Sequence, residues 1–215
     1  MDINYFNPRD KIEKHIYRLP HWQQTGTMYF VTWHLADSLP KSVRHKISFQ
    51  KQNWLKSHPK PWDAATSKEY HFNFTLPLEK YLDQGAGSCL LKQQKCAAAL
   101  KEVMLKYQDI RYEVDTFVIM PNHVHALFQC LDEWEIQKIL QQWKGVSSHE
   151  INRLQGSKPP LWQEGYWDRM IRSPEHLKRC RTYIRDNPKK AYLRAGEFIL
   201  FEKKRCEDTE RGHMS

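Results

Sequence analysis

The sequence predicts an α+β domain in which helices pack against a sheet, and three observations support this class. Residues 27–35 are dense in aromatic and β-branched residues, which is typical of a central strand. Residues 111–119 and 123–130 are expected to be adjacent strands, because only Met-Pro-Asn separates them. Long segments with apolar residues at helical spacing flank these strands and are expected to pack on the sheet.

The composition indicates one globular domain with an insertion, or two very small domains, since the chain has 215 residues and is 40% hydrophobic. No apolar run approaches membrane-spanning length, and the N-terminus lacks the basic-then-apolar order of a signal peptide. The five cysteines form no CxxC pair. We therefore expect reduced thiols in a cytoplasmic protein, and neither a disulfide framework nor a zinc knuckle.

The charge of the chain favours a polyanionic partner. Lys and Arg number 34 against 25 Asp and Glu, which gives a formal charge of +9. When Lys and Arg side chains neutralise the phosphates of a nucleic acid, condensed counterions are released, and this release favours binding. A nucleic acid is therefore the expected partner. Eight tryptophans and ten tyrosines could include platforms for unpaired bases, although aromatic residues more often belong to a core.

The first half of the chain contains one predicted strand, one predicted helix and two irregular segments. Residues 1–23 mix basic and aromatic side chains, and are either a basic arm on nucleic acid or a solvated segment. The strand at 27–35 is followed by a helix that opens after Pro40 and continues to about residue 56. We expect an irregular insertion at 57–88, because it contains three prolines and a Gly-Ala-Gly turn.

The second half contains three predicted helices and a flexible end. Apolar spacing predicts helices from residue 89 to about 107 and over 131–154, while 161–171 is a short strand or an extended crossing. Ser173 and Pro174 begin a helix that is expected to stop at Pro188. The predicted domain spans 1–196, and 197–215 is expected to be a flexible tail.

A histidine pair in the second strand of the predicted pair could hold a metal ion. Successive side chains of a strand point to opposite faces, so His123 and His125 share one face while Val124 and Ala126 face a core. Two neutral imidazoles can chelate one divalent cation and leave positions open for water and substrate. The alternative is a purely structural role, which is the more common one for an isolated HxH in a strand.

The predicted helix at 173–187 places a phenol and a carboxamide next to each other. Leu177 and Ile184 lie on its apolar stripe, while His176, Tyr183 and Asn187 lie along the flank of that stripe. Tyr183 and Asn187 are one turn apart and therefore neighbours. Taken singly, Tyr183 could be a hydrogen-bonded residue at the core rim and Asn187 a helix-ending residue.

These motifs resemble those of the REP-associated tyrosine transposases, which are relatives of the single-tyrosine HUH transposases of bacterial insertion sequences. The resemblance rests on Pro-Asn-His-Val-His at 121–125, Trp-Gln-Glu-Gly-Tyr-Trp-Asp-Arg-Met-Ile-Arg-Ser at 162–173 and Tyr-Ile-Arg-Asp-Asn-Pro at 183–188. It spans most of the chain, but the segment 57–88 is longer than the minimal family pattern. The resemblance implies a ferredoxin-like α+β fold with a central antiparallel sheet packed by helices.

The same resemblance implies the chemistry and the residues that perform it. His123 and His125 match the metal ligands, Asn187 the third ligand and Tyr183 the nucleophile of a metal-dependent single-stranded DNA endonuclease and strand transferase. Such an enzyme forms a 5′-phosphotyrosine intermediate on hairpin DNA. Oxygen and nitrogen ligands with open positions suit Mg²⁺ or Mn²⁺, whereas a zinc hydrolase would lack an HExxH motif.

The expected partner is single-stranded or hairpin DNA, with no membrane contact and with the protein a monomer or a homodimer. We expect four residues to help hold the DNA: Arg18, His21, Trp22 and Arg172. Two alternatives remain open from the sequence. The chain could be a replication initiator or relaxase-like nickase with the same chemistry, or a hairpin-DNA-binding protein without turnover.

Overall fold

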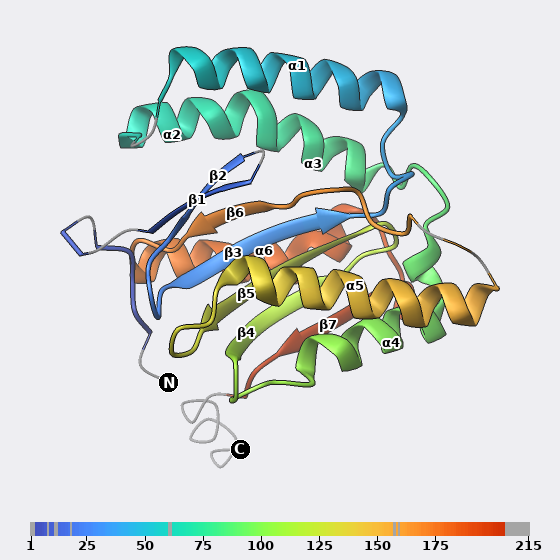
Figure 1. Ribbon diagram of the computed structural model, residues 1–215. Helices are drawn as coiled ribbons and strands as arrows, with labels where there is room; N and C mark the ends of the chain where they lie inside the picture. The colour runs from blue at the N-terminus through green and yellow to red at the C-terminus, as the bar shows by residue number, and fades with distance from the viewer. Residues whose placement is uncertain are drawn as a thin grey trace, which may run out of the picture.

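The computed structural model describes residues 3–7, 9–10, 13–17, 19–59, 62–156, 158 and 160–204. Of residues 13–17, 19–23, 64 and 67 it describes the backbone alone. Within this part of the chain, the five-stranded sheet and its helices form one α+β domain (Figure 1).

The central sheet is antiparallel throughout and has the strand order β6-β3-β5-β4-β7. Its strands are β3 (Met28–His34), β4 (Tyr112–Ile119), β5 (His123–Cys130), β6 (Trp167–Met170) and β7 (Ile199–Glu202). The strands predicted at 27–35, 111–119 and 123–130 are therefore confirmed within a residue at each end.

The topology of the sheet is ferredoxin-like. Two main helices, α4 (Gln94–Leu105) and α5 (Ile136–Gln155), connect its strands in the order β3-α4-β4-β5-α5-β6, and the strands lie side by side as β6-β3-β5-β4. This is the split β-α-β arrangement of ferredoxin-like folds, with β7 added beside β4. The predicted ferredoxin-like α+β class is thus confirmed.

One face of the sheet forms the main core beneath α4 and α5, which pack against each other in front of the strands in Figure 1. Alternate residues of β3 and β5 supply the sheet side of this core, as their period-two pattern predicts. The core includes Tyr29, Val31, Trp33, Val124, Ala126, Phe128, Leu100, Leu140 and Trp143.

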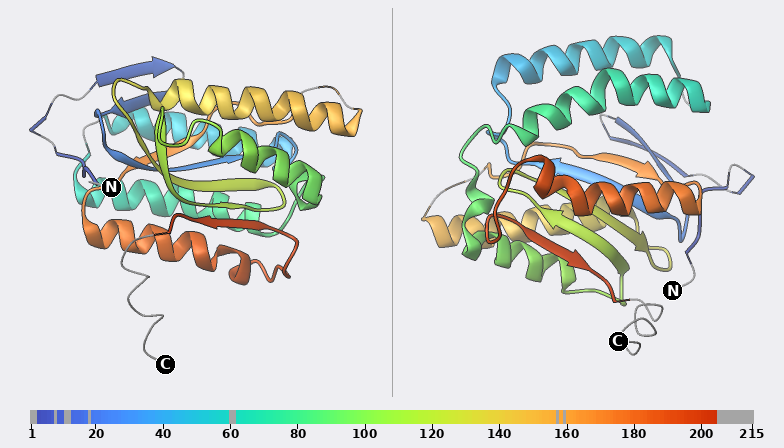
Figure 2. Two further views of the ribbon diagram at one scale, coloured as in Figure 1. Left: turned by 90° about the horizontal axis from the view of Figure 1, so that it is seen from below. Right: turned by 180° about the vertical axis from the view of Figure 1, so that it is seen from behind.

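The opposite face is covered by α6 (Pro174–Lys190), which crosses the sheet in the right-hand view of Figure 2. Leu177, Cys180 and Ile184 form a second core with Phe30 and Leu127 of the sheet. The apolar stripe predicted for this helix is therefore confirmed. Because His123 and His125 lie on this same face, α6 brings its own side chains toward them.

The segment predicted to be irregular, 57–88, is mostly helical, so that prediction was wrong. After α1 (Lys41–Ser57) it continues as α2 (Ala64–Tyr70), a π-helical turn at His71–Thr75 and α3 (Leu76–Asp83), and a 3-10 turn at Leu90–Lys92 precedes α4. Proline is tolerated in the first turn of a helix, where its missing N–H has no partner to lose, and Pro77 occupies that position in α3. Trp54, Trp62, Tyr70 and Phe74 pack together between α1 and this segment.

Two predictions near the C-terminus also need correction. The helix α6 does not stop at Pro188 but continues to Lys190, because a proline in the last turn removes only one of its hydrogen bonds. The tail predicted at 197–215 contains β7, which pairs with β4 from Thr116 to Ile119. Residues 205–215 lie outside the described part of the chain.

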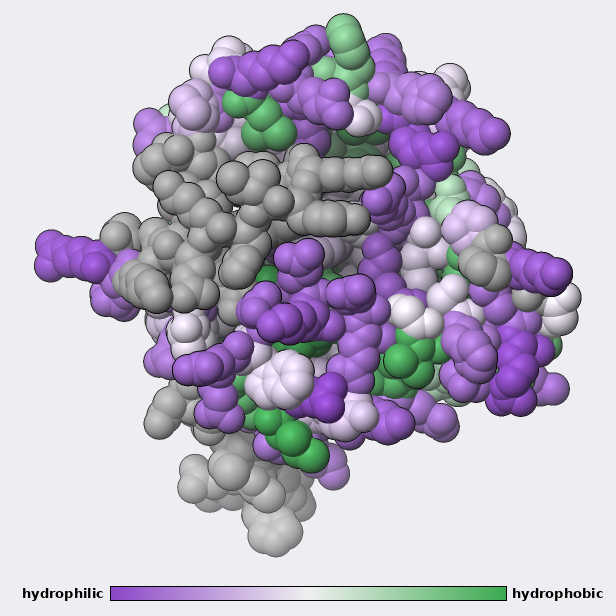
Figure 3. Space-filling view, in the orientation of Figure 1, coloured by the Kyte–Doolittle hydropathy of each residue, from purple (hydrophilic) through white to green (hydrophobic). Residues whose placement is uncertain are grey.

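The strands β1 (Glu13–Tyr17) and β2 (Leu19–Gln23) form a separate two-stranded ribbon, which the sequence did not predict. Among the described residues, no helix has the length and apolar character needed to span a membrane. The described part of the surface in Figure 3 is mostly hydrophilic, with small scattered hydrophobic patches.

Candidate active site

The histidine pair lies at the centre of the sheet, where β5 pairs with β3. His123 is opposite His34, and His125 is opposite Thr32, so the four side chains share the face that α6 covers. The rings of His123 and His125 are 4.7 Å apart between centroids, and both side chains are almost completely buried. The prediction that they share one strand face is confirmed.

The tautomer of His123 is fixed by Asn122. The Asn122 amide nitrogen donates to the carbonyl oxygens of Leu82 and Ala86, both at 3.1 Å, which directs its Oδ1 toward His123. His123 Nδ1 lies 2.7 Å from that oxygen and must therefore carry the proton. The other ring nitrogen, Nε2, is left with a free lone pair, as a metal ligand requires. From the sequence, Asn122 was interpreted only as a turn residue.

His125 is held in the same way by the neighbouring strand. Its Nδ1 shares a hydrogen bond of 2.7 Å with the hydroxyl of Thr32. Burial lowers the pKa of His123 to about 3 and lowers that of His125 well below its ordinary value. Both imidazoles are therefore neutral at physiological pH, and the Nε2 atoms of both are buried without a hydrogen-bond partner among the described residues.

An ion pair fixes the position of α6 over this site. Arg181 Nε donates to Asp115 Oδ2 at 2.8 Å and its Nη2 to Oδ1 at 2.5 Å, which is a bidentate contact. Asp115 lies at the register shift of β4 between Val114 and Thr116, and its side chain is only 3% exposed. Because Arg181 is two residues before Tyr183, this contact also fixes where the phenol lies.

We expect Asp115→Ala to destabilise the protein by about 3–5 kcal/mol, because it leaves the mostly buried Arg181 guanidinium without its partner. Urea unfolding measures the loss. Glu202→Ala is the matched control, since it breaks the Arg185–Glu202 pair, whose side chains are 51% and 36% exposed. That exposed pair should contribute no more than about 1 kcal/mol. Equal losses in the two variants would contradict the structural role assigned to Asp115.

Tyr183 projects from α6 directly toward the histidine pair. Its ring centroid is 5.1 Å from that of His125 and 5.8 Å from that of Phe30. The hydroxyl is buried and has no hydrogen bond of normal geometry within the part of the chain that the structure describes. Burial, followed by the charges of Glu79 and Asp83, raises the pKa of this phenol above its ordinary value.

Asn187 lies one turn beyond Tyr183 and is fully buried. Its carboxamide interacts with His123 and favours the protonated form of that ring, although burial outweighs this effect. Neither amide atom makes a hydrogen bond of normal geometry within the described residues. Buried carboxamides are normally satisfied, so the Asn187 oxygen is a candidate ligand for a group that binds in this site.

The chemistry of these donors fits a divalent cation. Nε2 of His123, Nε2 of His125 and Oδ1 of Asn187 are all buried, uncharged and unsatisfied, as ligands awaiting a cation would be. Over the described residues, no three His, Cys, Asp or Glu side chains converge on a metal position. The Asn187 carboxamide oxygen is of a type that hard divalent cations accept, so it is the candidate for a third protein donor.

Two carboxylates in the site were missed by the sequence analysis because they belong to α3, in the segment predicted to be irregular. Asp83 Oδ1 lies 4.0 Å from His123 Nε2, and Glu79 interacts with Tyr183. Burial raises the pKa of both carboxyl groups. The i, i+4 spacing of Leu78 and Leu82 could have revealed the helix, but nothing local indicates what it faces.

Arg169 of β6 is a further cation that the sequence analysis did not select. It is opposite Phe30 on the α6-covered face, with its guanidinium 5.0 Å from that ring, and its charge lowers the pKa values of His125 and Tyr183. A transferred phosphate is anionic, so a partly buried arginine here is suited to bind it.

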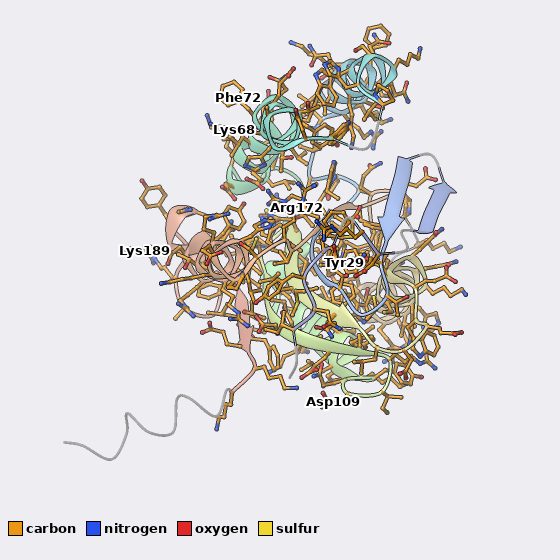
Figure 4. All side chains as sticks on the ribbon, turned by 90° about the vertical axis from the view of Figure 1, so that its left-hand side faces the viewer. Tyr29, Lys68, Phe72, Asp109, Arg172 and Lys189 are labelled. Atoms are coloured by element: carbon orange, nitrogen blue, oxygen red, sulfur yellow. The ribbon has the colours of Figure 1, made fainter. Side chains whose placement is uncertain are left out.

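The predicted DNA-binding residues are only partly described. Arg172 is exposed, with its guanidinium 5.4 Å from the ring of Phe6, and in Figure 4 it lies between the helices α2 and α3 above and the sheet below. Arg18 lies outside the described residues. His21 and Trp22 belong to β2, but their side chains lie outside the described part of the structure.

The fold and the site together define a class of protein. It is a ferredoxin-like domain in which a tyrosine on a helix lies beside two histidines on a strand. Residues 89–187 match the model of the IS200-like transposases, and this match includes the histidine pair, Tyr183 and Asn187. This part of the chain is therefore similar to the IS200-like transposases, in agreement with the resemblance to transposases found in the sequence. The helices α1 to α3 and the strand β3 lie outside the matched residues.

Two solved structures are similar to this chain at low identity. One is a REP-associated tyrosine transposase bound to a REP hairpin, with 14% identity, a TM-score of 0.44 and coverage of 81% of this chain and 74% of the other. The second is a protein from Deinococcus radiodurans R1 described as a transposase, with 12% identity, a TM-score of 0.35 and coverage of 77% and 93%. No curated protein matches the sequence significantly.

Proposed function

We propose that this protein is a transposase, a metal-dependent enzyme that nicks single-stranded DNA next to a hairpin and transfers the cut strand. In this proposal Tyr183 is the nucleophile and the product is a 5′-phosphotyrosine link with a free 3′-hydroxyl. One observation carries the proposal. The buried Tyr183 phenol lies against the His125 ring, next to His123, and among the described residues neither the phenol oxygen nor the Nε2 atoms of the two histidines have a hydrogen-bond partner of normal geometry.

Each residue of the site has a distinct task in this reaction. Tyr183 attacks the phosphorus in line, and the covalent link retains the energy of the broken bond, so that a second 3′-hydroxyl can reseal the strand. Arg169 is placed to bind the phosphate oxygens. Asn122 and Thr32 hold the rings of His123 and His125 in one orientation, which keeps both Nε2 atoms available.

His123, His125 and Asn187 would hold Mg²⁺ or Mn²⁺, which would screen the phosphate charge and polarise the phosphorus. The neutral imidazoles and the carboxamide oxygen contribute no negative charge. An anionic phosphate can therefore enter beside them without repulsion from these ligands. An uncharged set of protein ligands therefore suits a site in which the cation would also bind the phosphate of the substrate.

The proposed substrate is a DNA hairpin with a single-stranded flank. A fully paired duplex buries its bases and holds its backbone in a regular helix, whereas a flank can bend into a buried site. Exposed residues that could contact it lie on one side of Arg172 in Figure 4: Lys68 and Phe72 above it and to the left, and Lys189 to its left. The cytoplasmic location and the choice between monomer and homodimer stay predictions from the sequence.

The proposal predicts a covalent complex of protein and DNA. End-labelled hairpin DNA with a single-stranded flank should become attached to the protein in the presence of Mn²⁺, and the complex should survive a denaturing gel. The same sequence annealed as full duplex should give no attachment. A library of flank sequences covers the unknown recognition sequence.

Binding provides the control for this experiment. Fluorescence anisotropy should show tighter binding of the flanked hairpin than of the duplex, with both affinities falling steeply as salt rises. Equal affinity for the two substrates, or no covalent complex with any flank in the library, would contradict the proposal.

A further inference from the structure

Phe72 is an exposed aromatic side chain on the helical segment between α1 and α4. It belongs to the π-helical turn His71–Thr75, which joins α2 to α3, and it is 70% exposed. Tyr70 and Phe74, two positions away on either side, pack in the aromatic cluster against α1. Phe72 therefore projects from the opposite side of the same helix. A π-helical turn is rare and frequently marks a functional site, so an exposed ring on this turn calls for a functional explanation.

A contact with Arg169 places this turn beside the candidate active site. His71 directly precedes Phe72, and its Nδ1 lies 3.5 Å from Nη1 of Arg169. A guanidinium group only donates hydrogen bonds, so the His71 nitrogen is the acceptor in this contact. Arg169 lies on the sheet face that carries the histidine pair, where it is suited to bind the phosphate. A DNA strand whose phosphate binds Arg169 therefore passes the turn that carries Phe72.

The helix that carries Phe72 is fixed to the sheet. Leu78 and Leu82 of α3 belong to a small core against which Trp167 of β6 packs. The amide nitrogen of Asn122 donates to the carbonyl oxygen of Leu82 at 3.1 Å, which ties the end of α3 to the strand of the histidine pair. Because the helix is held at these points, a ligand that contacts Phe72 does not need to order the backbone beneath it.

The charge next to the Phe72 ring is positive. Lys68 is exposed and lies four residues before Phe72 on the same helix, a spacing at which side chains are neighbours. Figure 4 shows the two side chains next to each other, above and to the left of Arg172. The adjacent acidic residue, Glu69, instead faces α1, where its carboxylate accepts from Trp54 Nε1 at 2.9 Å. An exposed aromatic ring with basic neighbours is the arrangement that binds unpaired bases and the phosphates between them.

We propose that Phe72 is a platform on which one unpaired base of the single-stranded flank stacks, while Lys68 binds a phosphate of the same strand. This inference concerns the substrate of the proposed function and rests on it. Paired bases are covered by their neighbours in the duplex, so the platform favours an unpaired strand. Stacking uses the face of a base and not its edge, so it tolerates different base sequences. The contact would come from outside residues 89–187, which match the IS200-like model.

Fluorescence anisotropy with the flanked hairpin tests the inference. Phe72→Ala should weaken binding of this DNA about 5–150-fold, whereas Phe72→Trp should preserve it because it keeps a large aromatic face. Both variants should bind the same hairpin without a flank as the wild-type protein does. Their melting temperatures should stay near the wild-type value, since the ring is exposed.

Lys68→Gln tests the phosphate contact. It should weaken the binding of every flank sequence to a similar degree. It should also reduce the slope of log affinity against log salt concentration by about 0.7, as expected for one lost phosphate contact to a single strand.

Phe49→Ala is the matched control for the ring. Phe49 is 66% exposed and lies on α1 two positions from Lys51, whose Nζ is 5.7 Å from the ring centre of Trp167 on β6. Phe49 therefore projects from the side of α1 that faces away from the sheet. Its replacement removes the same ring from a site of similar exposure and should leave affinity for the flanked hairpin unchanged.

An abasic nucleotide, placed at each flank position in turn, identifies the base that stacks on Phe72. At one position its introduction should weaken wild-type binding by about the same factor as Phe72→Ala does. At that position the Phe72→Ala variant should show no further loss, because the two changes remove the same contact.

Four outcomes would overturn the inference. Phe72→Ala could bind the flanked hairpin as tightly as wild type, or lose the same factor with and without the flank. The losses from Phe72→Ala and from an abasic nucleotide could multiply at every flank position. Finally, Phe72→Ala could change the sedimentation of the free protein without changing DNA affinity, which would identify the ring as a contact between two copies of the chain.

These measurements report binding and do not need the covalent reaction, so the two proposals fail separately. A flank contact that depends on Phe72, in a wild-type protein that forms no covalent complex, refutes the proposed chemistry and leaves the platform in place. A covalent complex with an unaffected Phe72→Ala variant refutes only the platform. If the wild-type protein binds none of these DNAs, both proposals are wrong.

Discussion

Replacement of Tyr183 by phenylalanine is expected to abolish the covalent DNA complex and to leave hairpin binding intact. The substitution removes one oxygen and keeps the ring that packs against Phe30 and His125. Binding rests on many phosphate contacts, whereas the covalent link requires this single oxygen. The measurement is a denaturing gel with labelled hairpin, paired with anisotropy on the same samples.

Stability provides a second readout for the same variant. A tyrosine whose hydroxyl made a normal hydrogen bond would lose about 0.5–1.5 kcal/mol on conversion to phenylalanine. Among the described residues the buried Tyr183 hydroxyl makes no hydrogen bond of normal geometry, so its removal should leave the melting temperature unchanged or raise it. A retained or increased melting temperature together with a lost covalent complex is the signature of a nucleophile.

Tyr192→Phe is the matched control, because Tyr192 follows α6 and is 93% exposed. It should form the covalent complex at the wild-type rate. A Tyr183→Phe protein that still becomes attached to DNA would show that another residue attacks. That result would remove Tyr183 from the centre of the proposed reaction.

The second large effect is expected at the histidine pair. His123→Ala and His125→Ala should each abolish formation of the covalent complex, and EDTA should do the same to the wild-type protein, because each removes part of the proposed cation site. Hairpin binding should largely remain. Titration calorimetry with Mn²⁺ alone measures the loss of metal affinity directly and does not depend on activity.

Two further substitutions make this test specific. Asn122→Ala leaves both ligands present but frees the His123 ring, so Mn²⁺ affinity should fall about 10–100-fold, less than for loss of a ligand. His149, which is 77% exposed on α5, should tolerate alanine without change. If the wild-type protein forms the covalent complex at the same rate with and without EDTA, the proposed metal dependence of this site is wrong.

Much of the fold could be predicted because the patterns in its main elements are local. The aromatic and β-branched run at 27–35 and the two strands joined at Met120-Pro121-Asn122 lie where they were expected. The apolar stripe of α6 and its cap at Ser173, whose side chain accepts from His176 N, are confirmed as well. Periodicity and capping depend on a few neighbouring residues, so the sequence displays them directly.

Predictions that failed concern segments whose structure depends on distant partners. The strand β7 has only four residues and forms because β4 offers it an edge. The helices between 64 and 83 contain Pro77, which suggested a loop, but tertiary packing of Leu78 and Leu82 with Leu39 stabilises the last of them. A short element gains its stability from tertiary contacts that its own composition does not reveal.

The sequence by itself determined that His123 and His125 share a strand face and that Tyr183 and Asn187 share a helix flank. Both follow from the fixed periods of strand and helix. Only the tertiary structure decided that this helix lies over that strand face and that Asn122 orients His123. The same holds for α3, whose Asp83 Oδ1 lies 4.0 Å from His123 Nε2. Contacts between residues so far apart in sequence are set by how whole elements pack, and no local pattern encodes them.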